Sequence, residues 1–278
     1  MRSLAVVLLA GGLAFPASAS APEPQGAELE YRVYVGGIGA ARYAVRYTAT
    51  EGRTAIALTG QTEGMTDWFA GWRATQFAEA DFDPRAPHIA PRIEYRSASI
   101  FRSEPRDVRL SLFPDRPADW WASPEKDDEP RTPIDVAQTR GVFDPLTASF
   151  LSLSRIGDSQ TCPDQLPIFD GRRRFDAVFR PAQSEVLKAS SYSMFAGPTL
   201  VCRFVIKRLG GYIIRETDWN RPEDRERPIT VHLASVLPGH PRVPVRIESE
   251  LTLGSIIVHL VAARAVSGET RMAALPPN

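Results

Sequence analysis

The segment LEYRVYVGGIGAARYAVRY, residues 29–47, decides the fold class of this chain. Apolar side chains occupy every second position on either side of a glycine-rich turn, namely Leu29, Tyr31, Val33 and Val35 before it, and Tyr43, Val45 and Tyr47 after it. This period of two is typical of strands with one buried and one wet face, and the glycines suit a turn between them. The segment therefore predicts antiparallel pairing, because parallel strands buried on both faces form continuous apolar runs.

The same alternation recurs along the chain, at residues 56–60, 108–112, 174–179, 229–233 and 243–247. So many short alternating segments favour a mainly β protein, built as one large curled antiparallel sheet that forms a half-barrel or a barrel. Pro244 cannot donate a backbone hydrogen bond, so it predicts an edge strand or a bulge at that position.

Two segments break the alternation and predict short helices packed on or across the sheet. Met65, Phe69 and Trp72 recur at helical spacing. Asp144-Pro145 is a typical helix start, with a capping aspartate followed by proline in the first turn. We expect this second helix to end near Gly157.

The first 19 residues have the pattern of a secretory signal peptide. Arg2 precedes an apolar run from Leu4 to Phe15, and small residues follow at 17–19. The run is too short to span a bilayer, so we expect cleavage after Ala19 and a periplasmic protein that does not span the membrane. Residues 20–278 are then expected to form a single mainly β domain, with an irregular, proline-rich acidic loop at 114–133 and a frayed tail at 268–278.

The two cysteines, Cys162 and Cys202, predict a disulfide, because an isolated pair in an exported chain meets an oxidising compartment. Closing this loop should stabilise the fold by about 4 kcal/mol in the loop-entropy model. Two free buried thiols are the alternative.

The charges and motifs exclude several classes of function. Lysine and arginine total 33, as do aspartate and glutamate, so the basic excess of a nucleic-acid binder is absent. No two of the four histidines stand at metal-ligand spacing, and no nucleophile elbow occurs. We therefore expect no metal, no cofactor and no nucleic-acid partner, and we assign no catalytic residue.

The strongest local feature is FDGRRRF, residues 169–175. Asp170-Gly171 predicts a turn, after which alternation places Arg172 and Arg174 on the same face. Two such arginines could hold a phosphate or a carboxylate. The alternative, which we favour, is a hairpin whose arginines pair with acidic neighbours on adjacent strands.

Several of these motifs together resemble one family. They are the first hairpin with its glycines 36–39, the segment 62–72, the DPLTA at 144–148, Cys162 with LPIFDGRRRF at 166–175, Cys202 with GGY at 210–212, and the hairpin around Leu253-Gly254. The chain resembles the exported Gram-negative family known as a domain of unknown function, number thirty-one-oh-eight. The resemblance implies an exported, mainly β protein and supplies no catalytic residues.

Three functions remain open. The first is non-enzymatic binding or carriage of a lipid or other apolar or amphiphilic envelope ligand. Its expected lining consists of Trp68, Phe69, Trp72, Phe150 and Leu151, with Arg172 and Arg174 at the rim. The alternative is a structural or assembly factor of the envelope whose protein partners are unknown. The third is a carboxylate-dependent glycan hydrolase.

Overall fold

The computed structural model describes residues 25–50, 52–82, 90–124, 130–150, 161–214, 227–251 and 254–276. The expected signal peptide, residues 1–19, lies outside this part of the chain, as do Leu151 and the expected helix end at Gly157.

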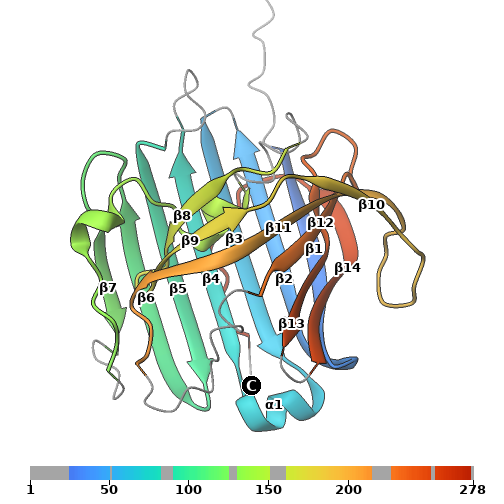
Figure 1. Ribbon diagram of the computed structural model, residues 1–278, viewed down its shortest axis with the longest axis horizontal. Coiled ribbons are helices and arrows are strands. Elements are labelled where there is room, and N and C mark those ends of the chain that lie inside the picture. Colours follow the sequence, from blue (N-terminus) through green and yellow to red (C-terminus); the bar gives the residue numbers. More distant parts are fainter. Residues whose placement is uncertain are drawn as a thin grey trace, which may run out of the picture.

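A 14-stranded antiparallel sheet dominates the described residues (Figure 1). Its strands are β1 (Gln25–Val35), β2 (Ile38–Thr50), β3 (Arg53–Thr62), β4 (Arg73–Asp81), β5 (Arg92–Phe101), β6 (Glu104–Leu112), β7 (Asp119–Ser123), β8 (Gln165–Phe169), β9 (Arg174–Phe179), β10 (Gln183–Leu187), β11 (Gly197–Gly210), β12 (Ile229–Ala234), β13 (Val243–Leu251) and β14 (Gly254–Val266). The spatial order is β7-β6-β5-β4-β3-β2-β1-β14-β13-β12-β11-β9-β8, and β10 also pairs with β11. Helix α1 (Gly64–Ala70) connects β3 to β4, and a 3-10 helix, η1 (Val136–Thr139), lies in the connection between β7 and β8.

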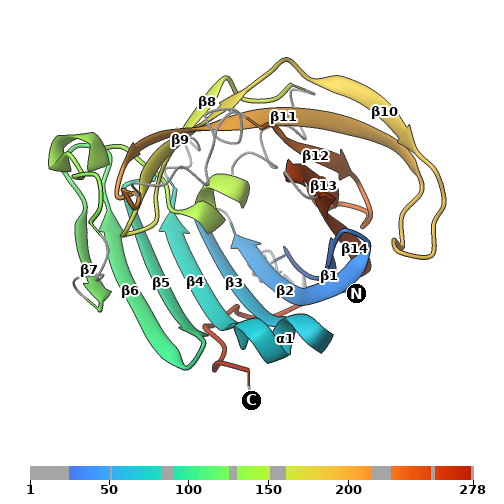
Figure 2. The same ribbon diagram turned by 60° about the horizontal axis from the view of Figure 1, so that its bottom comes forward.

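The sheet curls until its two ends face each other (Figure 2). Strands β1 to β7 form one wall and β8 to β11 form the opposite wall. The edge strands β7 and β8 are not hydrogen-bonded neighbours in the described sheet. They meet through side chains instead, because the rings of Trp120 and Phe169 lie 5.1 Å apart in an edge-to-face contact. The predicted mainly β, curled antiparallel sheet is therefore confirmed, and it is not closed.

Strand β7 corrects the prediction of an irregular loop at 114–133. Asp119–Ser123 pair with β6 in antiparallel register, so that Leu110 lies opposite Trp120. Trp120 faces inward to Phe169, whereas Trp121 faces outward beside Arg109. The strand was missed because prolines at 117 and 124 and nearby acidic residues dominate the composition of this segment.

The space between the walls holds the main hydrophobic core. Inward side chains of β1 to β6 pack there with residues of β13 and β14. At Pro244 the pairing register with β12 shifts by one residue. Of the two alternatives predicted for Pro244, the bulge is therefore correct. Strand β13 is not an edge, because it lies between β12 and β14.

A helical turn at residues 145–150 lies between the two walls (Figure 2). It begins as predicted, because the Asp144 carboxylate accepts hydrogen bonds from the backbone N–H of Leu146 (2.8 Å) and Thr147 (3.1 Å). The side chain of Asp144 is completely buried. Burial raises the pKa of this carboxyl to about 6, although the capping hydrogen bonds oppose the shift.

This shift predicts how stability depends on pH. Because the pKa of Asp144 is higher in the folded state, the folded state binds the proton more tightly than the unfolded state does. The stabilisation that this proton gives is complete below the unfolded pKa and is lost as the pH rises through 6. At pH 8 the buried charge should cost up to about 3 kcal/mol. Asp144→Asn keeps the cap and removes the charge, so we expect it to stabilise the protein at pH 8 but not at pH 4, as measured by urea unfolding. Equal effects at both pH values would contradict this account.

The C-terminal segment 268–276, where a frayed tail was expected, has no regular secondary structure and lies against the sheet. It crosses the outer side of β3 and β4 (Figure 2). Thr270 is buried, and the Thr75 hydroxyl donates a 3.0 Å hydrogen bond to the Ala273 carbonyl. The outward side chains of the sheet therefore pack against this segment.

The predicted disulfide is confirmed. Cys162, just before β8, is bonded to Cys202 in β11, and their Cα atoms lie 5.8 Å apart. Cys202 packs with Leu200 and Leu233 in a small apolar cluster. The bond thereby ties the chain just before edge strand β8 to the long strand β11.

Candidate functional site

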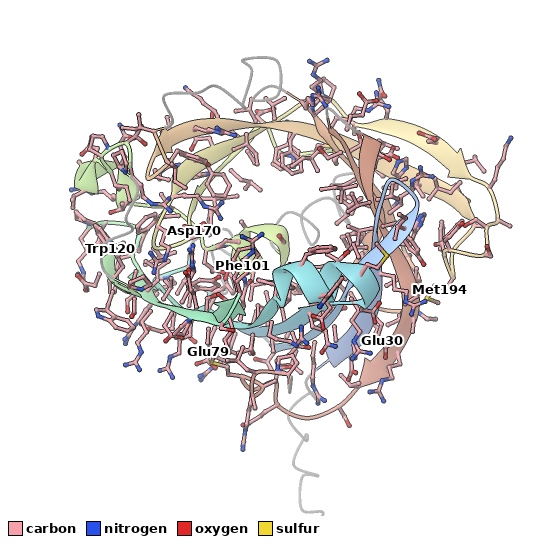
Figure 3. The ribbon with its side chains drawn as sticks, turned by 90° about the horizontal axis from the view of Figure 1, so that it is seen from below. Glu30, Glu79, Phe101, Trp120, Asp170 and Met194 are labelled. Carbon is pink, nitrogen blue, oxygen red and sulfur yellow. A yellow bond between two sulfur atoms is a disulfide. The ribbon has the colours of Figure 1, made fainter. Side chains whose placement is uncertain are left out.

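One end of the curled sheet carries a group of exposed apolar side chains, which we call the α1 rim. Its members come from α1 and from the two neighbouring hairpin ends, and they are Val35, Ile38, Met65, Trp68, Phe69 and Phe101. Trp68 is 86% exposed, Met65 70% and Phe69 64%. Figure 3, a view into this end, shows α1 in front of the wall formed by β2 to β4. A group of large exposed apolar side chains at one end of a fold is typical of a binding site.

Backbone contacts hold α1 between the β1–β2 and β5–β6 hairpins. At its start, Glu63 N–H donates to the Ala40 carbonyl (2.9 Å). At its end, Arg102 donates through its backbone N–H to Ala70 (3.0 Å) and through Nε to the Phe69 carbonyl (3.3 Å). These contacts bring the two apolar hairpin ends to opposite ends of the helix.

The turn that carries Arg102 has an unusual backbone. Arg102 and Ser103 have φ values of 51° and 68°, a region that favours glycine. Phe101 and Glu104 are paired across this two-residue turn. Such residues cost on the order of 1 kcal/mol each, and the two hydrogen bonds of Arg102 to the helix end oppose that cost.

A charged contact also fixes α1 on the sheet. The Asp67 carboxylate accepts hydrogen bonds from the Arg73 guanidinium of β4 and from the Thr62 hydroxyl (2.7 Å). These two donors lower the pKa of Asp67 to about 2. The helix therefore stays anchored over the whole physiological pH range although none of its residues is buried.

Immediately after α1 the chain turns into the interior. Gly71 has a left-handed φ of 51° and ends the helix. Trp72 then packs on Tyr43, with ring centroids 5.6 Å apart, above the bare backbone of Gly60. A Cβ on Gly60 would approach both rings to within 2.8 Å. The apolar surface thus continues from the rim to the inner wall.

Deeper between the walls, Phe150 contacts the ring of Tyr47 at 5.3 Å. The Tyr47 hydroxyl also lies 3.2 Å from Nδ1 of His240. Burial raises the pKa of Tyr47 to about 12, so the hydroxyl is neutral.

The structure separates the seven residues that the sequence grouped as a ligand site. Trp72 and Phe150 face the interior as expected, and Leu151 lies outside the described residues. Trp68 and Phe69 do not line the interior, because α1 turns them to solvent.

Arg172 and Arg174 lie at the seam between the two sheet ends. Arg174 is buried and pairs with Asp176 at 2.6 Å, and it also donates to the carbonyls of Gln138 (2.8 Å) and Phe175 (2.6 Å). Arg172 donates to the carbonyl of Ser123 at 2.6 Å. The favoured alternative holds in part, because Arg174 pairs with an acidic residue, which lies on its own strand.

Four members of the α1 rim were not predicted as site residues: Met65 was expected only as part of a helix, and the other three lie beside hairpin turns. Val35 and Ile38 flank the turn glycines of the first hairpin, and Phe101 precedes the next turn. An apolar residue directly beside a turn has no strand face to bury it, which is the signal that could have revealed them.

Two negative findings concern only the described residues. None of their His, Cys, Asp and Glu side chains form a group of three or more that could hold a metal ion. In the same ranges, no helix is long and apolar enough to cross a membrane.

Comparison with known proteins identifies the family. A family model described as a protein of unknown function (DUF3108) matches residues 30–261. The chain belongs to the DUF3108 family. This confirms the resemblance that the sequence motifs indicated. The DUF3108 match begins in β1 and ends in β14, so it contains the curled sheet and the α1 rim.

A solved structure is also similar to this DUF3108 protein. It is a beta-barrel-like protein of the domain of unknown function DUF1849 from Brucella abortus, with 12% sequence identity and a TM-score of 0.46. The alignment covers 90% of this chain and 100% of that one. No curated protein matches the sequence.

Proposed function

We propose that this DUF3108 protein is exported to the periplasm and binds the apolar part of an amphiphilic envelope ligand at the α1 rim. The observation that carries the proposal is the continuity of the exposed rim with the inner aromatic wall through Trp72 and Tyr43. The disulfide and the signal-like sequence of residues 1–19 support export.

The free energy of the exposed side chains supports binding. Covering a large apolar side chain such as Trp68 or Phe69 contributes roughly 1.5–3 kcal/mol. The contacts of α1 hold these side chains in solvent before any ligand arrives, so little ordering is needed on binding. Arg102 at the helix end could contact a polar head group.

Envelope assembly through protein contacts is the second candidate, because Trp, Phe and Met are also enriched at protein interfaces. We favour an amphiphile because the apolar surface does not end at the rim but continues through Trp72 to Tyr43, which packs against the core between the walls.

A glycan hydrolase is the weakest candidate. Asp144 has the raised pKa that a general acid needs, but it is completely buried and its carboxylate caps a helix. Such a group cannot reach a glycosidic oxygen.

The test is equilibrium binding of radiolabelled lysophosphatidylethanolamine to the purified protein. We expect Trp68→Ser with Phe69→Ser to weaken binding by at least about tenfold, because each substitution removes contact area of the size given above. Trp121→Ser is the matched control, since Trp121 is an exposed tryptophan on β7, outside the rim. Unchanged binding by the double variant, or equal weakening by the control, would contradict the proposal.

A further inference from the structure

A pocket of about 640 Å³ lies on the outer face of β1, β2 and β3, outside the curl. We call it the outer pocket. Outward side chains of the three strands, among them Glu30, form its floor, and Tyr192 and Pro276 lie at its border. Figure 3 shows Met194, which belongs to the same loop as Tyr192, on the same side of the molecule as Glu30.

The loop between β10 and β11 is fixed against the sheet beside this pocket. Met194 N–H donates to the Leu260 carbonyl of β14 at 3.0 Å. The Tyr192 ring lies 5.1 Å from that of Tyr34, edge to face, and stacks on His259 at 6.1 Å. His259 is only 9% exposed, so the tyrosine has a rigid support. The pocket border is therefore formed before a ligand binds.

The charges of the outer pocket cancel. Its charged side chains are Glu30, Arg32, Arg42 and Glu63. The two arginines reach Glu63 only at 3.8 Å and 3.6 Å, which is too long for good hydrogen bonds. An anionic ligand would gain from the arginines and lose to the glutamates. The pocket therefore offers hydrogen-bond donors and acceptors to a ligand but carries no net charge.

We propose that the outer pocket binds a neutral saccharide. Sugar hydroxyls donate and accept hydrogen bonds equally, which matches a mixture of guanidinium, carboxylate and the Gln61 amide. The apolar C–H face of a sugar ring can lie on the aromatic surface of Tyr34 and Tyr192. The volume lies in the range of about 300–1,000 Å³ that small ligands occupy. None of the α1 rim side chains lines this pocket, although Tyr43, which connects the rim to the inner wall, also borders it.

The test is isothermal titration of the full disulfide-bonded protein with cellotetraose, maltotetraose and chitotetraose. We expect at least one of them to bind with a millimolar or lower Kd, and Tyr192→Ala to weaken it by about tenfold. Met194→Ala is the matched control, because Met194 lies in the same loop but does not line the pocket. Inorganic phosphate should not compete.

Three results would overturn this inference. They are no binding of any of the three sugars, displacement by phosphate, and equal weakening by Met194→Ala. Phosphatidylcholine vesicles that contain glucosyl diacylglycerol distinguish a lipid-borne sugar from a free glycan. If the pocket binds a lipid-borne sugar, the wild-type protein should cosediment with these vesicles and Tyr192→Ala should not. Trp68→Ser should leave oligosaccharide binding unchanged, so failure here is distinct from failure of the amphiphile proposal.

Discussion

Asp176→Ala is expected to lower the free energy of unfolding by about 3–5 kcal/mol, because it leaves a buried guanidinium without its counter-ion. Asp176 and Arg174 are both more than nine-tenths buried, and Nη1 of the arginine lies 2.6 Å from the carboxylate. The second carboxylate oxygen accepts a 2.8 Å hydrogen bond from Gln165 of β8. The pair thus joins β9 to β8 at the free end of the sheet.

Urea unfolding at neutral pH measures this loss. Asp119→Ala is the matched control, because its ion pair with Arg116 is exposed and should contribute less than about 1 kcal/mol. If Asp176→Ala changed stability no more than the control, Arg174 would not need its partner, and a ligand-binding role for that arginine would become plausible again.

Removing the disulfide with Cys162→Ala and Cys202→Ala is expected to destabilise the protein by about 4 kcal/mol. The bond closes a loop between residues 40 apart in sequence, and the loop-entropy model gives this value for such a length. The loss comes from the greater freedom of the unfolded chain, so the refolded variant should keep its β-sheet circular dichroism spectrum.

Reduction of the wild type offers an independent control for this prediction. Guanidinium unfolding in excess dithiothreitol should give the same midpoint as the double alanine variant. A difference of less than about 1 kcal/mol between oxidised wild type and variant would show that the bond constrains little of the unfolded chain.

Much of the sheet could be predicted because alternation records directly which face of a strand is buried. Leu29 and Tyr31 are buried, as the pattern requires, and Arg32, the next residue along the strand, is exposed. Whether the curled sheet closes could not be predicted, because that depends on how its two ends meet through Trp120 and Phe169, which are far apart in sequence.

The site was harder to predict because helical spacing does not show where a helix ends. The spacing of Met65, Phe69 and Trp72 suggested a single apolar stripe. The left-handed backbone at Gly71 ends the helix before Trp72, so the tryptophan turns inward while the other two remain outside. The arginines of 172–174 showed a similar limit, since Arg172 also donates to the carbonyl of Ser123 and Arg174 to that of Gln138, and both acceptors are far away in sequence.

The most direct test of amphiphile binding is native mass spectrometry of the disulfide-bonded protein, purified without detergent from a periplasmic extract. We expect the wild type to carry a bound mass that organic extraction identifies as a lipid, and Trp68→Ser with Phe69→Ser to lack it. Detection of only the bare polypeptide mass in both proteins would contradict the proposed function.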